Sequence, residues 1–123
     1  MPNPIFLDHF RHPRNAGELA DATVTVIVEN PACGDVMKLA ARIESDCATA
    51  VRFQVRGCAA SIAAGSVLTE LLLSRPLPQW HQIDTQQIDI ALGGLPMASR
   101  HAAELCVDAV RALLRALGWP ARP

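Results

Sequence analysis

Residues 22–57 decide the fold, and they read "ATVTVIVENPACGDVMKLAARIESDCATAVRFQVRG". Three runs in this stretch are β-branched or alternate between apolar and polar residues: 22–28, 35–43 and 49–57. In the third run Val51, Phe53 and Val55 alternate with polar side chains, so one face of the sheet is expected to be buried. Because the connections are short, with residues 44–48 as one turn, the three strands are predicted to form an antiparallel meander.

The segments that flank this stretch have helical character. Helices are expected at residues 4–11, 59–74, 84–92 and 98–117. The second is rich in Ala, Gly and Ser, which suits close packing against a sheet, and Asp84 is the expected N-cap of the third. His9 and His12 flank the first helix and are predicted to be surface or capping groups. The order of elements predicts a single α+β domain over residues 1–123, with a three-stranded antiparallel sheet and helices packed on one face.

Composition limits the classes of partner. The chain has 123 residues, half of them apolar, and a formal net charge of −1, so nothing in its charge predicts a nucleic-acid or membrane partner. Its most apolar stretch contains Ser, Thr and Glu and is shorter than the roughly 20 apolar residues that span a bilayer. Acids and prolines occupy the start of the chain, so no signal peptide is expected. A cytoplasmic protein is therefore predicted, whose four cysteines are thiols or ligands rather than disulfides.

The predicted meander brings two cysteines to the same end of the sheet. Cys33 lies in the first loop and Cys58 follows the third strand, whereas Cys47 falls in the turn at the opposite end. Asp35 adds an oxygen ligand beside Cys33, and His101, at the start of the last helix, is the best fourth group for a tetrahedral metal site. Spacing alone also allows a turn cysteine, a small buried thiol and a polar residue at a helix start. A nucleophilic cysteine with histidine as its base is a further alternative.

Four motifs occur in order along the chain: "DHFRHPRNAGEL", "NPACGD", "RFQVRGCAASIAAGSVLTELL" and "GLPMASRHAAELCVDAVRALL". Over roughly residues 5–117 the chain thereby resembles the iron–sulfur cluster assembly scaffold family, of the IscU and NifU N-terminal-domain type. The resemblance implies a non-enzymatic scaffold that binds iron and a transient [2Fe–2S] cluster, with zinc as an alternative metal in the purified resting protein. It also implies a cysteine desulfurase as sulfur donor, apo iron–sulfur proteins as acceptors, and Cys33, Asp35, Cys58 and His101 as metal ligands.

The chain departs from the family pattern directly after the histidine. The family has a third cysteine there, but this chain has Ala102, and Cys106 follows one helical turn later, about 6 Å along the helix axis. Cys106 is therefore interpreted as a buried core thiol, with a displaced ligand as the alternative. Because Ala102 cannot receive persulfide sulfur, a second hypothesis is a divergent zinc- or iron-binding relative that has lost cluster assembly and binds metal or the desulfurase.

A second departure lies in the loop before His101. The family pattern Leu-Pro-Pro-Val-Lys, which a dedicated chaperone reads, appears here as Leu95-Pro96-Met97-Ala98-Ser99. The second proline and the lysine are missing, which weakens the case for recognition by an Hsp70-type chaperone. Leu95, Pro96 and Met97 remain candidates for partner binding.

Overall fold

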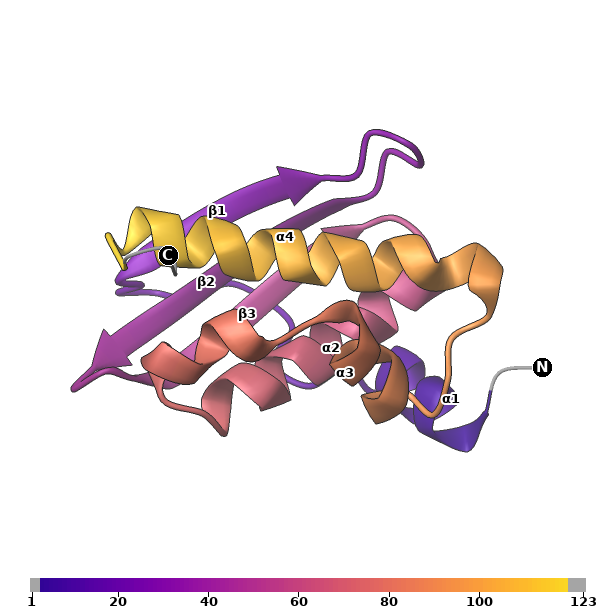
Figure 1. Cartoon of the computed structure of the whole chain (residues 1–123), viewed down its shortest axis with the longest axis horizontal. Coiled ribbons are helices and arrows are strands. Elements are labelled where there is room, and N and C mark those ends of the chain that lie inside the picture. Colours follow the sequence, from indigo (N-terminus) through magenta and orange to yellow (C-terminus); the bar gives the residue numbers. More distant parts are fainter. Residues whose placement is uncertain (1–2, 120–123) are drawn as a thin grey trace.

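A three-stranded sheet forms one layer of the structure, and helices α2 and α4 lie across one face of it (Figure 1). The computed structural model describes residues 3–119. Its elements are α1 (Pro4–Arg11), β1 (Val24–Glu29), β2 (Val36–Glu44), β3 (Cys47–Arg56), α2 (Ala59–Leu73), the 3-10 helix η1 (Leu77–Gln82), α3 (Thr85–Ala91), the 3-10 helix η2 (Met97–Ser99) and α4 (Arg100–Ala116). The strand order is β1-β2-β3 with both pairs antiparallel, which confirms the predicted fold class.

The turn between β2 and β3 is tighter than predicted. Ser45 and Asp46 both have positive φ, at 52° and 62°, as a two-residue hairpin turn of the primed type requires. Cys47 pairs with Glu44 and begins β3, so the expectation that residues 44–48 form a turn holding Cys47 was wrong. Primed turns match the twist of the flanking strands, and that match lets the strand pairing continue to the turn. Cys47 still lies at the end of the sheet opposite Val36, as the meander predicted.

Close approach of α2 to the sheet explains its small residues. A Cβ atom on Gly65 would lie 2.5 Å from the ring of Phe53 in β3, so only glycine allows this contact. One face of α4 is fully buried, and it consists of Ala102, Cys106, Ala109 and Leu113. The small-residue packing was predicted from the sequence. This packing of α2 and α4 against the sheet determines where the N-terminal end of each helix lies relative to the strand ends.

Polar contacts hold helix α1 to the body of the protein. Asn3 caps the helix by accepting from the Phe6 N–H at 2.9 Å, and its amide donates to the carbonyl of Leu92. His9 is buried, with Nδ1 at 2.7 Å from Ser66 Oγ of α2. The prediction of His9 as a surface or capping group was therefore wrong, because its partner lies far away in the sequence. Burial and the charge of Arg14 lower the pKa of His9.

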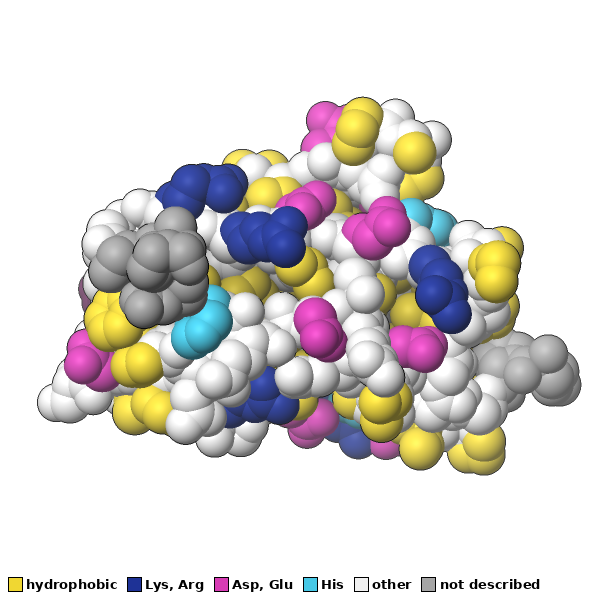
Figure 2. All heavy atoms as spheres, in the orientation of Figure 1, with side chains coloured by type: hydrophobic (Ala, Val, Ile, Leu, Met, Phe, Trp, Pro, Cys, Tyr) yellow, Lys and Arg dark blue, Asp and Glu magenta, His cyan; other side chains and the backbone are white. Residues whose placement is uncertain are grey.

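The face of the molecule that carries α4 mixes charges of both signs. Acidic and basic side chains are interspersed over it, with hydrophobic atoms visible between them (Figure 2). Between Asn3 and Trp119, no helix has the length and apolar character needed to cross a membrane.

Candidate metal centre

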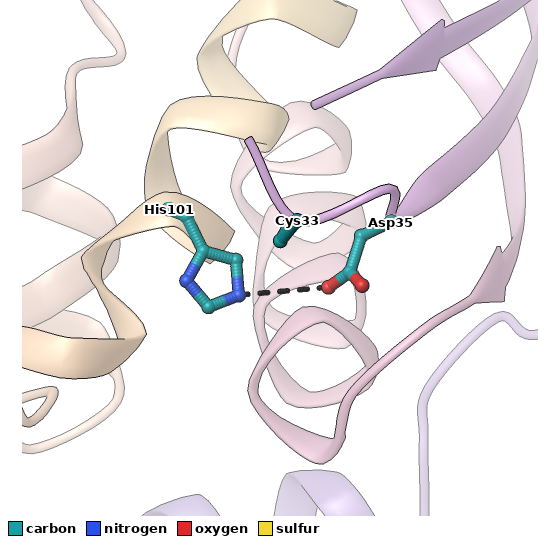
Figure 3. A group of neighbouring side chains, drawn as sticks. All are labelled: Cys33, Asp35 and His101. Atoms are coloured by element: carbon teal, nitrogen blue, oxygen red, sulfur yellow. Dashed lines mark ion pairs between the residues drawn. The ribbon is translucent and has the colours of Figure 1, made fainter. Parts of the chain in front are cut away.

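Three segments meet at one end of the sheet: the β1–β2 loop, the junction between β3 and α2, and the start of α4 (Figure 1). Cys33, Asp35 and His101 each offer one ligand atom there, and these atoms lie within 4.8 Å of one another. Figure 3 shows the Asp35 carboxylate facing the imidazole of His101, with Cys33 beside them on the loop. The distance from Asp35 Oδ2 to His101 Nε2 is 3.6 Å.

Cys58 lies beside two members of this group, Asp35 and His101. It is the N-cap residue of α2, and its Sγ lies 3.1 Å from Asp35 Oδ2 and 3.4 Å from His101 Nε2. The structure thus brings together all four residues that the sequence singled out. Two sulfurs, one imidazole nitrogen and one carboxylate oxygen make a donor set of the kind that suits zinc or an iron–sulfur cluster. Ligation by these residues stays a prediction.

The loop that carries Cys33 and Asp35 is closed by its own hydrogen bonds. The Asn30 N–H donates to the Asp35 carbonyl at 2.9 Å, and the Gly34 N–H donates to the Asn30 carbonyl at 2.7 Å. The Asn30 side chain accepts from the Ala32 N–H, an Asx turn, and Gly34 has a φ of 77°, which glycine adopts without strain. As a result Cys33 is exposed at the tip while Asp35 is buried.

Asp35 is held by donors from α2. Its Oδ2 accepts from the Ser61 hydroxyl at 2.6 Å and from the Cys58 backbone N–H at 3.4 Å. Burial alone would raise the pKa of the Asp35 carboxyl, but the hydrogen bonds from Ser61 and Cys58 outweigh it and lower this pKa below 3.8. The carboxylate is therefore ionised at neutral pH and available as a ligand.

Gly57 makes room for that carboxylate. A Cβ atom there would lie 2.4 Å from Asp35 Cγ and 2.5 Å from Asp35 Oδ1, which no side chain could occupy without displacement. The roles of both Gly57 and Ser61 were not predicted from the sequence. Their only signal was their position beside Cys58, and glycine and serine are common near helix N-termini for purely local reasons.

His101 is oriented by its second ring nitrogen. Nδ1 lies 3.2 Å from the carbonyl oxygen of Ala98. A carbonyl only accepts hydrogen bonds, so this contact places a proton on Nδ1. When the ring is neutral, the lone pair is then on Nε2, which faces Cys58 and Asp35. This is the tautomer that a metal-binding imidazole needs, and the outer hydrogen bond fixes the ring as such partners do in metal proteins.

The other residues that the sequence singled out lie outside this group of four side chains. Cys106 is fully buried on α4, and burial raises the pKa of its thiol well above the ordinary value, as expected for a core residue. Leu95 and Pro96 line a groove of about 440 Å³ that also reaches Cys58 and His101. Beside it Met97 is 79% exposed, so the loop offers apolar surface next to the cluster.

Comparison with known proteins identifies the family. The model of the NifU-like N terminal domain matches residues 3–117, and the chain belongs to this family. It is 38% identical to the iron-sulfur cluster assembly scaffold protein IscU 1 of Archaeoglobus fulgidus, over 85% of this chain and 68% of that protein. It is 36% identical to the scaffold protein IscU of Aquifex aeolicus, over 92% of this chain and 73% of that protein. These matches confirm the resemblance seen in the motifs.

Solved structures show the same fold. The N-terminal part of a nitrogen-fixing NifU-like protein from Brucella abortus superposes with a TM-score of 0.75 at 19% identity, covering 97% of this chain and 95% of that one. A putative iron-sulfur cluster assembly scaffold protein for the SUF system from Fervidobacterium islandicum gives 0.74 at 18% identity, covering 91% and 95%.

Proposed function

We propose that this protein is an iron–sulfur cluster assembly scaffold, which binds iron and a transient [2Fe–2S] cluster and passes the cluster to acceptor proteins. The observation that carries the proposal is the convergence of Cys33, Asp35, Cys58 and His101 at one end of a NifU-type domain. The names of its relatives as scaffold proteins point the same way.

The four side chains have distinct parts in this proposal. Cys33 and Cys58 supply the thiolates that iron–sulfur clusters require, and His101 supplies a neutral imidazole through Nε2. Asp35 supplies a hard oxygen, which is a poorer partner than a thiolate for a cluster and so favours release. Release is what a donor of clusters needs. The same set of donors would accept zinc in the resting protein.

Sulfur must come from outside the chain. A cysteine desulfurase would present it as a persulfide, so the chain itself acts as carrier and not as enzyme. The position of the family's third thiol is filled by the methyl group of Ala102, which leaves the exposed Cys33 and the half-buried Cys58 as acceptors. The loop from Leu95 to Met97 would contact partners, and the expected compartment is the cytoplasm.

Zinc binding without cluster assembly is the second candidate. It is favoured by one observation, the missing thiol at Ala102, combined with the burial of Cys106 in the core. The scaffold proposal has broader support because it also accounts for the exposed thiol of Cys33 and for the relatives.

Anaerobic reconstitution with ferrous iron, a desulfurase and cysteine separates the two candidates. A scaffold is expected to develop sulfide-to-iron charge-transfer absorption and then convert an apo-ferredoxin to its holo form. Cys33→Ala and Cys58→Ala should each abolish both signals. Cys47→Ala is the matched control, since this exposed thiol lies at the far end of the sheet. Tight zinc binding with no charge-transfer bands in the wild type would refute the scaffold proposal and favour the second candidate.

A further inference from the structure

Ser61 is hydrogen-bonded to Asp35, one of the four candidate metal ligands. It lies in the first turn of α2, three residues after the N-cap Cys58, and its side chain is fully buried. Its Oγ is 2.6 Å from Asp35 Oδ2. An ionised carboxylate only accepts hydrogen bonds, so the Ser61 hydroxyl donates. Hydrogen bonds to a charged acceptor are the stronger class, and this one is short and shielded from water.

The other contacts of Asp35 Oδ2 come from the groups proposed as ligands. Cys58 Sγ lies 3.1 Å away and His101 Nε2 lies 3.6 Å away. Oδ2 also accepts from the Cys58 backbone N–H at 3.4 Å. A carboxylate has about four lone-pair sites on its two oxygens, so it can accept from Ser61 and Cys58 and still bind a metal. The Ser61 hydrogen bond is therefore compatible with metal binding by Asp35.

The carboxylate is enclosed on two sides. Gly57 leaves it space where any Cβ atom would collide, and Ser61 holds it from α2. Without the hydroxyl, the buried carboxylate would lose its closest donor and keep only the longer hydrogen bond from the Cys58 N–H, so it would gain by turning toward water.

We propose that Ser61 is a positioning residue. Its hydroxyl holds the Asp35 carboxylate turned toward Cys58 and His101, so that the carboxylate can bind the incoming metal. The inference rests on the proposed function, since it assigns Ser61 a part in the same site. Ser61 itself does not ligate the metal. It acts through Asp35, and this makes its effect separable from a general effect on folding.

Metal titration of the purified full chain tests the inference. The probes are Zn²⁺, in competition with a chromophoric chelator, and Co²⁺, whose visible spectrum reports its ligands. Ser61→Ala is expected to weaken zinc binding about tenfold, the low end of the effect of outer partners on metal affinity. Its cobalt spectrum should shift toward that of Asp35→Ala. Ser61→Thr keeps the hydroxyl and should restore the wild-type spectrum.

A double-mutant cycle gives the sharpest outcome. In the Asp35→Ala background, Ser61→Ala should cause no further loss of zinc affinity, because the carboxylate that it positions is absent. Ser66→Ala is the matched control: it removes another fully buried hydroxyl of α2, one bonded to His9, and should lower Tm without changing the cobalt spectrum.

Three results would contradict the inference. One is a Ser61→Ala protein with wild-type zinc affinity and cobalt spectrum. Another is an equal loss of affinity with and without Asp35. A third is a wild-type protein that binds neither zinc nor cobalt, in which case the proposed function fails as well. The first two results leave the proposed function intact, so the two failures are distinguishable.

Discussion

Gly57→Ala is the substitution whose effect on the metal site can be worked out most completely from the structure. The new Cβ atom would lie 2.4 Å from Asp35 Cγ, whereas ordinary van der Waals contact begins at 3.4 Å, so the carboxylate must move by about 1 Å. It cannot move further toward α2, because Ser61 Oγ is already 2.6 Å from Oδ2. The carboxylate is therefore expected to turn away from the other candidate ligands, Cys58 and His101.

Two measurable losses follow from that displacement. The protein loses hydrogen bonds to a buried charged group, worth about 2 kcal/mol in the free energy of unfolding, which is a fall in Tm of roughly 7 °C for a chain of this size. It also loses the oxygen ligand, so zinc affinity should fall to the level of Asp35→Ala. Gly57 is not among the residues with positive φ, and alanine therefore adds crowding without backbone strain.

Thermal unfolding of the metal-free protein by circular dichroism and zinc titration against a chromophoric chelator measure the two losses. Asp35→Ala is the informative background, since it removes Cγ and Oδ1 and leaves only the Cβ atom of residue 35, 2.9 Å from the new methyl group. Gly57→Ala should cost clearly less stability there, and no further zinc affinity. A Gly57→Ala protein with wild-type Tm and wild-type zinc affinity would refute the reasoning.

Three further predictions concern the rest of the molecule. The pKa of His9 is lowered from 6.5 in the folded protein, so neutral His9 stabilises the fold above pH 6.5 and this stabilisation is lost on acidification below it. Urea unfolding should therefore show a lower free energy of unfolding at pH 5.5 than at pH 7.5, and His9→Gln should reduce this difference. An equal difference in wild type and His9→Gln would contradict the prediction. Iodoacetamide followed by mass spectrometry should modify Cys33 in the native protein but Cys106 only after unfolding; native labelling of Cys106 would count against its core position. Gly65→Ala should cost about 1–3 kcal/mol in unfolding free energy by collision with Phe53, with zinc affinity unchanged, and a loss of zinc affinity would show that the two regions are coupled.

Local patterns were sufficient to predict the sheet and the end of it at which the candidate ligand side chains meet. The alternation in residues 35–43 and 49–57 reports directly which side chains face the core, so strands and their order followed without any tertiary information. Once the meander was set, chain direction alone placed Cys33 and Cys58 at one end and Cys47 at the other, which the strand register confirms. Cys106 is fully buried on α4, in agreement with its interpretation as a core thiol.

Contacts between distant segments were beyond those patterns. His9 is buried because Ser66 supplies a partner from another helix, and nothing near residue 9 in the sequence reveals it. Ser61 and Gly57 likewise matter only because Asp35 folds against them from the β1–β2 loop. A buried polar group is determined by where its partner lies in space, and local sequence carries little information on that.

X-ray absorption spectroscopy at the zinc edge of the zinc-loaded protein tests the central claim most directly, because it counts the atoms bound to the metal. Coordination by Cys33, Asp35, Cys58 and His101 predicts two sulfurs at about 2.3 Å and two nitrogen or oxygen atoms at about 2.0–2.2 Å. One sulfur should be lost in Cys33→Ala, and one light atom should be replaced or lost in Asp35→Ala. Three or four sulfurs, or a first shell unchanged in both variants, would contradict the assignment of these four residues as the metal site.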